Sequence, residues 1–510
     1  MSRILSIVLF LFLSAIEKSY SQQIDWLKCY GGSEQDDAFA IKNTFDNGLI
    51  VVGSTMSGDG DVSTNYGQTD CWIVKLDTNG EIQWEKNYGG SGTETAYTIQ
   101  PTSDNGYIFA GATDSNDGDV AGQHGYYDVW VVKIDSAGNI KWQNCLGGSD
   151  RESAYSVIEC IDRGFILAGY TLSDDGNISN HIGDLDAWVI KLDVTGNLEW
   201  EKTFGSTIRE YANVIIQTPD KGYLMGGTQR IINDSTACDD AWIVKMDSLG
   251  NLEWERTYGG KWDEGINSLI QTDNNKYVFA ASASSKDGDV TGNHGSSDFW
   301  IVGIDNSGNL LWQKCFGGSS VDVPRHISLT EDKGFIICGN TWSNDGDVNG
   351  LSGFIDAWII RTDSLANLKW QKCIGSVDID DAFCSTILND EIYVLGNSNG
   401  SNDIFNNNNG GYDFWVSELS VTVGIKDILA LHSYEIYPNP TRNQSFTIKS
   451  RSNYNNTQIT CYSSIGKKIH QQKIKSTETE IDVSEWPAGI YLVVLHRDGK
   501  VMDTMKLIVQ

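Results

Sequence analysis

Pairs of carboxylates around a single glycine recur along the sequence. Asp-Gly-Asp-Val occurs four times at one place of a longer repeated pattern, and Asp175-Gly176-Asn177 is a fifth, altered copy. The aspartates of the four full copies are Asp59, Asp61, Asp117, Asp119, Asp287, Asp289, Asp345 and Asp347. Two carboxylates with Asn or Ser nearby suit a hard cation such as Ca²⁺, which takes six or more oxygen ligands. The pattern supplies only a few of those oxygens, so an acidic turn held by side-chain-to-backbone hydrogen bonds is the favoured alternative.

A second acidic position occurs once in every repeat, ten residues after a tryptophan. It is filled by Asp36, Glu94, Glu152, Glu210, Glu264, Asp322 and Asp380. Each residue lies just before the first expected strand of its repeat. The functional interpretation is a ring of carboxylates at one mouth of a channel, able to hold a cation. The structural interpretation is a turn in which each carboxylate accepts backbone N–H bonds, and its presence in all seven repeats favours this second interpretation.

A third acidic position belongs to the motif Asp-x-Trp, which occurs seven times. The pairs are Asp70 and Trp72, Asp128 and Trp130, Asp186 and Trp188, Asp240 and Trp242, Asp298 and Trp300, Asp356 and Trp358, and Asp413 and Trp415. An indole buries a large apolar area, so we expect the tryptophans to be wedges between repeats. The aspartates are then structural partners of the repeat, and not metal ligands or catalytic acids.

The remaining chemistry-bearing residues form no catalytic pattern. The seven histidines have no metal-ligand spacing, although His124 and His294 share one loop position. No glycine-rich phosphate loop follows a strand and opens a helix. We therefore predict no catalytic residues and no certain cofactor, with Ca²⁺ as the one candidate ion.

The elements that must position these residues follow from two series of tryptophans. Each series has seven members, and the members recur at intervals of about 58 residues. One period holds four strand-like runs, which in the second copy are 96–102, 107–113, 129–134 and 140–146. Four strands per unit and seven units predict an all-β fold, a seven-bladed β-propeller over residues 22–420. A solenoid coil is usually shorter than this period, and separate sandwiches would need linkers that the sequence lacks.

The two ends of the repeated region complement each other. Residues 24–32 carry the motif of a fourth strand, and residues 413–416 carry the motif of a third strand. We expect the N-terminal strand to complete the last blade, because such closure leaves no exposed sheet edges.

Ten cysteines are spread along the chain. Cys29, Cys145, Cys315 and Cys373 occupy one position of the repeat, three residues after a tryptophan. Equivalent positions on neighbouring blades lie too far apart for a disulfide, whose Cα atoms must come within about 7 Å. We interpret most of the cysteines as small buried strand residues.

Charge and the N-terminus indicate where the protein works. The formal net charge of −31 argues against nucleic acid or an anionic membrane as a partner. Residues 1–21 are expected to be a signal peptide, with Arg3, an apolar run over 4–16 and a cleavage site before Gln22. A membrane anchor is the alternative, but it needs about 20 apolar residues. We expect no transmembrane segment in the mature chain.

The composition changes after Leu419, where basic residues come to outnumber acidic ones. Residues 421–433 are expected to be a linker, and 434–510 a small β-sandwich with strands near 446–449, 458–462, 468–473, 490–496 and 502–508. Its motifs include Tyr437, Pro438, Asn439, Pro440, Gly466, Gly489, Tyr491 and Lys506. In this order they resemble the type A C-terminal sorting domain of the type IX secretion system. An ordinary ligand-binding β-sandwich is the alternative.

The resemblance implies a Gram-negative bacterium and a route to the outside. It implies export through the Sec pathway, passage through the outer-membrane translocon of the system, and release or anchoring at the cell surface. The propeller repeats also resemble those of other cargo of this system.

Three functions remain open. The first is a non-enzymatic secreted or surface binding protein with a glycan or protein ligand. The second is an extracellular hydrolase or lyase acting in the channel of the propeller, and the third is a structural surface protein. The near-identical repeats favour the first and third, since a catalytic site usually breaks symmetry.

Overall fold

The computed structural model describes residues 20–510 except for 234–235, 273–275, 401–403, 406–407, 409, 424–433, 442–444, 451–456, 464–466, 475 and 498–499. Every regular element in the described residues is a β-strand, so the all-β prediction is confirmed. The described residues contain no helix that could cross a membrane. The predicted signal peptide lies outside them except for its last two residues, as does most of the predicted linker.

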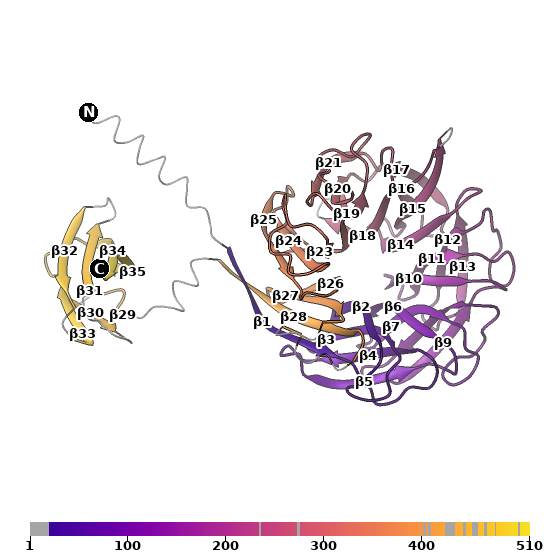
Figure 1. The fold of residues 1–510 in the computed structure, drawn as a ribbon, viewed down its shortest axis with the longest axis horizontal. Coiled ribbons are helices and arrows are strands. Elements are labelled where there is room, and N and C mark those ends of the chain that lie inside the picture. Colours follow the sequence, from indigo (N-terminus) through magenta and orange to yellow (C-terminus); the bar gives the residue numbers. More distant parts are fainter. Residues whose placement is uncertain are drawn as a thin grey trace. The chain divides into compact units, whose positions relative to one another are not determined.

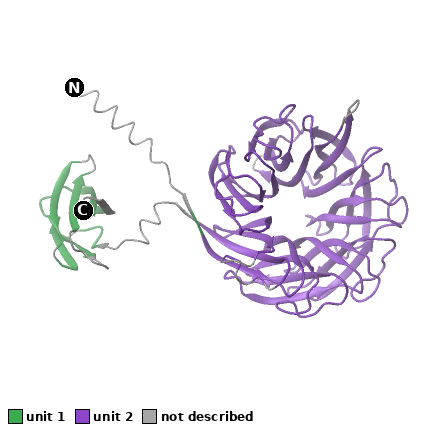
Figure 2. Cartoon of the chain, in the orientation of Figure 1, with its two compact units in different colours: residues 1–23, 421–510 green, residues 24–420 purple. Residues whose placement is uncertain are grey.

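Two compact units divide the chain (Figure 2). One unit consists of residues 24–420, and the other consists of residues 421–510 together with 1–23. Each unit is described below by itself.

Four-stranded sheets build the unit of residues 24–420, and its described residues form seven of them. Six sheets use four consecutive strands each, paired in chain order. They are β2 (Asp36–Asn43), β3 (Leu49–Thr55), β4 (Asp70–Leu76) and β5 (Ile82–Tyr88); β6 (Glu94–Pro101), β7 (Tyr107–Thr113), β8 (Asp128–Ile134) and β9 (Ile140–Leu146); β10 (Glu152–Glu159), β11 (Phe165–Thr171), β12 (Asp186–Leu192) and β13 (Leu198–Phe204); β14 (Glu210–Gln217), β15 (Tyr223–Asn233), β16 (Thr236–Met246) and β17 (Leu252–Tyr258); β18 (Glu264–Thr272), β19 (Lys276–Ala283), β20 (Asp298–Ile304) and β21 (Leu310–Phe316); and β22 (Asp322–Leu329), β23 (Phe335–Thr341), β24 (Asp356–Thr362) and β25 (Leu368–Ile374).

The remaining sheet joins strands from both ends of the unit. Its order is β1 (Tyr20–Tyr30), β28 (Asp413–Val423), β27 (Glu391–Ser398) and β26 (Asp380–Leu388). The first strands of the sheets contact one another in succession from β2 to β26, and β26 also contacts β2. In Figure 1 these first strands surround the middle of the unit. The arrangement is propeller-like.

The hydrophobic core lies between neighbouring sheets. Trp130 of β8 packs in one cluster with Phe109 of its own sheet and Ile73 of the preceding sheet. A second cluster joins Trp72 of β4 to Phe414 of β28, and the two rings are 5.1 Å apart. Sheets packed face to face by interlocking side chains leave few voids. The stability of each sheet therefore depends on its packing against both neighbours.

A buried cation in the third strand repeats through most sheets. Lys133 is 5 % exposed, and its Nζ lies 2.9 Å from Asp104, which belongs to the turn between the first two strands. The same pairs are Lys75 with Asp46, Lys191 with Asp162 and Lys245 with Asp220, and Arg361, which is half-buried, pairs with Asp332. Breaking such a pair would leave a buried charge uncompensated.

The C-terminal unit consists of two packed sheets. One has the order β29 (Tyr434–Tyr437), β30 (Ser445–Ser450), β33 (Glu478–Asp482), and the other β32 (Lys468–Lys473), β31 (Thr457–Ser463), β34 (Gly489–Arg497), β35 (Lys500–Val509). Phe446 of the first sheet and Leu495 of the second belong to one buried cluster. The sequence predicted five of these strands and missed β29 and β33.

Candidate functional site

The acidic residues ten positions after a tryptophan are the first residues of β2, β6, β10, β14, β18, β22 and β26, and none is more than 2 % exposed. The hydrogen bonds of Glu94 are an example. Its Oε2 accepts a bond of 2.8 Å from the Gly90 N–H, and its Oε1 accepts one of 2.7 Å from the Thr113 hydroxyl. Glu152 makes the same two bonds with Gly148 and Thr171. These carboxylates hold the connection between sheets, which favours the turn interpretation over a cation ring.

Six of the seven aspartates of Asp-x-Trp are also fully buried, and Asp240 is half-buried. Asp128 Oδ2 accepts a bond of 2.9 Å from the His124 N–H and lies 2.6 Å from His124 Nδ1. The Oδ1 atoms of Asp70 and Asp298 have no hydrogen-bond partner among the described residues. Burial, with a smaller contribution from Glu94, raises the pKa of Asp70 to about 6.

Two carboxylates from neighbouring sheets meet over one glycine. A Cβ atom on Gly89 would come within 2.4 Å of Glu94 Oε2 and 2.6 Å of Asp70 Oδ1. The two carboxylates fill the space that a side chain would need, so any larger residue at this position must displace them. Close like charges in a buried place disfavour ionisation.

Each Asp-Gly-Asp loop is hydrogen-bonded to the connection that precedes its own sheet. Asp119 donates its N–H to the Gly89 carbonyl over 2.9 Å and accepts the Gly89 N–H at Oδ2 over 3.4 Å. Asp117 Oδ1 accepts the Ser91 N–H over 2.7 Å. Asn177 makes the equivalent bond to the Gly147 N–H over 3.0 Å with a neutral amide. The hydrogen bond, and not the charge, is therefore the shared property of these positions.

The residues of these loops do not fit a calcium ion well. Each loop brings two carboxylates, and in the other full copies too they accept backbone N–H groups. The described residues contain no group of three or more His, Cys, Asp or Glu that could hold a metal ion. Ca²⁺ takes six to eight oxygen ligands, so the turn interpretation fits these loops better.

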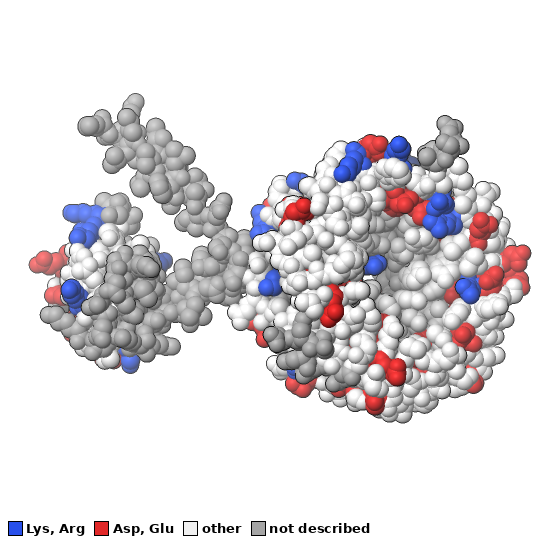
Figure 3. Space-filling model, viewed as in Figure 1, with Lys and Arg blue, Asp and Glu red and all other residues white. Residues whose placement is uncertain are grey.

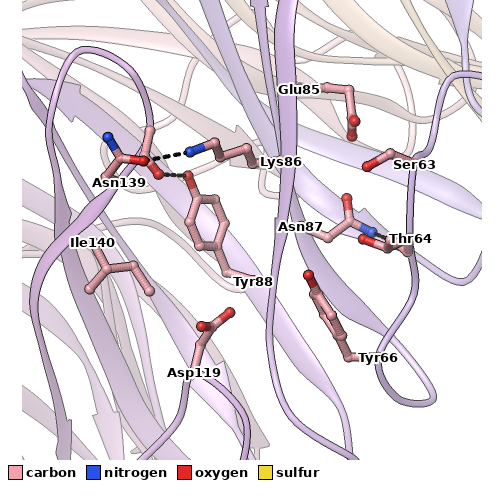
Figure 4. A pocket seen from close by; sticks show the side chains of 11 residues that line it. Ser63, Thr64, Tyr66, Glu85, Lys86, Asn87, Tyr88, Asp119, Asn139 and Ile140 are labelled. Carbon is pink, nitrogen blue, oxygen red and sulfur yellow. Dashed lines mark hydrogen bonds between the residues drawn. The ribbon is translucent and has the colours of Figure 1, made fainter.

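Figure 4 shows a polar pocket of about 420 Å³ between the sheets β2–β5 and β6–β9. Its polar groups are largely bonded within the fold. The Tyr88 hydroxyl donates to the Gly138 carbonyl over 2.6 Å, and Lys86 Nζ donates to Asn139 Oδ1 over 3.0 Å. Glu85 accepts the indole N–H of Trp72 over 3.0 Å. Few groups remain to bind a ligand here.

One position of the first strand carries different residue types in different sheets. In each first strand the register shifts across one residue, which makes a β-bulge. The bulge residues are Phe39, Tyr97, Tyr155, Asn213, Asn267, Arg325 and Phe383. Bulges re-aim side chains and are common beside active sites. Here the seven equivalent residues fall into four aromatic residues, two amides and one arginine.

Five of the bulge residues touch in sequence around the inner strands. The ring centroids are 5.7 Å apart for Phe39 and Phe383, 5.2 Å for Phe39 and Tyr97, and 5.1 Å for Tyr97 and Tyr155. The Arg325 guanidinium lies 5.6 Å from the Phe383 ring centroid. We call Arg325, Phe383, Phe39, Tyr97 and Tyr155 the aromatic arc. Its four rings are partly exposed and its arginine is exposed.

The other two bulge residues tie neighbouring strands together. Asn213 Nδ2 donates to the Ile266 carbonyl over 2.8 Å, and Asn267 Nδ2 donates to the Pro324 carbonyl over 2.7 Å. Their amides thus serve the backbone of the next first strand.

Two carboxylates lie beside the arc. Asp37 and Asp381 precede Phe39 and Phe383 by two residues and are likewise partly exposed. Partial burial raises the pKa of both, and Arg325 opposes that rise for Asp381. Asp37 accepts bonds of 2.6 Å from Gln35 Nε2 and 3.1 Å from Asn397 Nδ2. The arc and these acids form a partly desolvated surface with aromatic, acidic and basic groups.

Sequence reasoning did not identify this surface. The signal was available, because each bulge residue stands three positions after the repeated acidic residue. A pattern of positions that stay the same in every repeat does not reveal it, because its residue type changes from repeat to repeat.

The cysteines offer no reactive centre. All ten are free thiols, and nine are buried. Burial raises the pKa of Cys384, but His326 more than reverses this and lowers it to about 6. The Cys384 side chain is 3 % exposed, so a substrate cannot reach it.

The sorting motifs meet at one end of the C-terminal unit. Asn439 Nδ2 donates to the Lys506 carbonyl over 2.6 Å, and Asn439 Oδ1 accepts the Ile508 N–H over 3.0 Å. The Tyr491 hydroxyl donates to the Pro487 carbonyl over 2.6 Å. Gly466 lies outside the described residues. The segment that begins at Tyr437 is thereby fixed to the last strand.

Residues 435–510 match the family of the secretion system C-terminal sorting domain. This is the domain that the motifs resembled, and it marks the protein as type IX cargo that is secreted or held at the cell surface. No protein with a curated description matches the chain.

Several solved structures are similar in fold. The Pan2 WD40 domain of Neurospora crassa is 11 % identical over 78 % of this chain and 95 % of its own, with a TM-score of 0.42. PorZ, described as a surface component of the type IX secretion system of Porphyromonas gingivalis, is 11 % identical over 94 % of this chain and 60 % of its own, with a TM-score of 0.43. Sqt1 from Chaetomium thermophilum is 12 % identical over 74 % of this chain and 97 % of its own, with a TM-score of 0.39. These sequence identities and TM-scores are too low to support an inference about function.

Proposed function

We propose that the protein is a non-enzymatic binding protein, a secreted or surface-held β-propeller with seven blades whose inner strands present a ligand site. The ligand is a glycan or a protein. The contact between β26 and β2 and the place of β1 beside β28 support a closed ring. The buried acids at the start of each blade and the Asp-x-Trp motifs are assigned to the framework of that ring.

One observation carries the proposal of binding. Residues that hold the sheets together repeat in nearly every blade, whereas the bulge residues of the first strands differ. A framework role in every blade would demand side chains that make the same hydrogen bond, as the buried acids at the strand starts do, and aromatic rings cannot replace the amide bonds of Asn213 and Asn267. The departure is concentrated on partly exposed side chains of rigid strands, which is where a binding site is best positioned.

Arrays of glycans and of proteins probed with the full mature protein test the proposal. We expect ligands whose signal falls at least tenfold in the Tyr97→Ala variant and is unchanged in Tyr66→Ala. Tyr66 is an exposed tyrosine of a β3–β4 loop and provides the matched control. Array signals that are equal for both variants and the native protein would contradict binding at the inner strands. Turnover of an arrayed glycan would favour the hydrolase or lyase alternative instead.

Export is proposed to depend on both ends of the chain. Residues 1–21 would direct the chain to the periplasm, and residues 434–510 to the outer-membrane translocon. A chain ending at residue 420, expressed in the producing bacterium, should then accumulate in the periplasm, while the full chain reaches the surface or medium. Efficient appearance of the shortened chain in the medium, without lysis, would contradict this route.

A further inference from the structure

We propose that the aromatic arc binds an organic cation, namely the ammonium or guanidinium group of a lysine or arginine side chain on a basic protein segment. The inference rests on the proposed binding at the inner strands and names the chemistry of the ligand. It thus chooses the protein ligand over the glycan.

The arc brings together four partly exposed aromatic rings, which pack tilted or edge-on against one another. Phe383, Phe39, Tyr97 and Tyr155 come from four neighbouring sheets, and their centroids are between 5.1 and 5.7 Å apart along the arc. An aromatic ring attracts a cation through the negative charge on its face, and the attraction grows where water is partly excluded. Because all four residues lie on strands, the rings are held without the entropy cost of ordering a loop.

The molecule already places one cation on this surface. The guanidinium of Arg325 lies over the Phe383 ring, 5.6 Å from its centroid. That contact occurs between the bulge residues of adjacent first strands, β22 and β26. The three rings that follow along the arc have no such basic neighbour in the bulge positions, since the remaining two bulge residues are Asn213 and Asn267.

The charges beside the arc select for a cation. Asp37 and Asp381 lie two residues before Phe39 and Phe383 on the same strands, and Arg325 partly offsets the charge of Asp381. The space-filling view shows the unit hollowed at its middle, which the first strands surround (Figures 1 and 3). A concave surface focuses the field of its charges, and the net charge of −31 adds a long-range attraction for basic partners.

A neutral or anionic ligand fits these groups less well. The amides of Asn213 and Asn267, which could have bound sugar hydroxyl groups, donate to backbone carbonyls of the next strand. Asp37 already accepts bonds from two amide side chains. What the surface still offers is partly exposed aromatic rings with carboxylates beside them, and this combination recognises cations.

Calorimetric titration of the full mature protein with a tetra-lysine peptide tests the inference. The matched probe is the same peptide with all four side chains acetylated, which keeps the length and removes the charges. Both titrations are run at 150 mM NaCl, because salt screens non-specific attraction. We expect binding of the cationic peptide only, and an increase in Kd of at least tenfold in Tyr97→Ala and in Asp37→Asn.

Two controls separate the site from general electrostatics and from misfolding. Asp150→Asn removes one exposed charge from the connection between β9 and β10, five residues before Tyr155 of the arc, and should bind as the native protein does. The melting temperature of each variant shows whether it is folded, and Tyr97→Phe, which keeps a ring, should bind within threefold of the native protein. Equal weakening by Asp150→Asn and Asp37→Asn, or equal binding of both peptides, would overturn the inference.

The array experiment distinguishes a wrong ligand class from a wrong site. A neutral glycan whose binding is lost in Tyr97→Ala, with no binding of the cationic peptide, would overturn the cation and keep the site. No ligand sensitive to Tyr97→Ala in either experiment would overturn both.

Discussion

The connections between sheets and the bulges of the first strands obey opposite rules. At the connections the same hydrogen bonds recur from sheet to sheet, even where the side chain changes from aspartate to glutamate or asparagine. At the bulges the backbone recurs, but the side chains are aromatic, amide or basic. A position that keeps its bonds serves the fold, and a position that keeps its backbone while varying its side chain is available for recognition.

The strongest test of the framework is a glycine in a second strand. A Cβ on Gly111 would lie 1.8 Å from the Thr95 carbonyl oxygen of β6, so Gly111→Ala must displace the backbone of the first strand. We expect a loss of about 3 kcal/mol or more in the free energy of unfolding, as for overpacked core sites. Denaturant unfolding measures it. Gly58→Ala, whose Cβ would meet nothing closer than 3.9 Å, should change stability by less than about 0.5 kcal/mol.

Acidification should strengthen the framework before it weakens it. Burial raises the pKa of both Asp70 and Asp240 to about 6, above the usual 3.8. Between the unfolded value of 3.8 and the folded value of about 6, the folded protein binds more protons than the unfolded chain. The free energy of unfolding therefore rises as the pH falls through this range. From pH 7.5 to 5 we expect a gain on the order of 1 kcal/mol for each such carboxyl.

Melting curves across this pH range check that expectation. The double variant Asp70→Asn and Asp240→Asn should show a smaller rise, because two titrating groups are gone. A native protein whose melting temperature falls steadily from pH 7.5 to 5 would contradict the assignment.

The stability that the Asp-Gly-Asp loops give to the connections between sheets should depend on a hydrogen bond and not on charge. Asp119→Asn keeps an acceptor for the Gly89 N–H, as Asn177 does in its own sheet. We expect Asp119→Asn to melt like the native protein and Asp119→Ala to lose about 1 kcal/mol. Equal losses in the two variants, measured by denaturant unfolding, would show that the charge matters.

Replacing one aromatic bulge residue by another that occurs at the same position should change stability little. Phe39 and Phe383 occupy the same position as Tyr97, and all three rings contact their neighbours in the arc. Tyr97→Phe is therefore expected to change the free energy of unfolding by less than about 0.5 kcal/mol. A larger loss in denaturant unfolding would place the Tyr97 hydroxyl in the framework.

Calcium should have the smallest effect. Because both carboxylates of each Asp-Gly-Asp loop accept backbone N–H groups, millimolar CaCl₂ should raise the melting temperature no more than NaCl of equal ionic strength. A larger rise with calcium that is lost on changing Asp117 and Asp119 to Asn would restore the calcium interpretation.

Much of the fold could be read from the sequence because its signals are local. Trp72 and Trp26 begin two series that recur at intervals of about 58 residues, and Gly, Asn and Asp mark the turns between strands. The strand β33 was missed because its residues Glu478–Asp482 are mostly charged or polar and read as a loop until β30 pairs with them. The sequence of β33 carries no local mark of this pairing, unlike β1, whose motif repeats that of the other fourth strands.

The candidate site was less predictable for the same reason. The partner of Asp119 is Gly89, in the preceding connection, and no periodicity reveals such a bond. A β-bulge is likewise invisible in composition, since Tyr97 reads as an ordinary strand residue until its register is known. The residues themselves could be found, but their convergence on one surface requires the tertiary structure.

The pairing of β1 with β28 has a kinetic consequence. These strands are the earliest and the latest of the unit to be synthesised, so their sheet has the longest possible loop to close. Contacts between such distant segments form slowly. Until β28 is available, β1 has no partner strand beside it, and exposed strand edges are prone to aggregation. A chaperone that shields the N-terminal strand would therefore speed the assembly of this protein most during the interval before its last sheet forms.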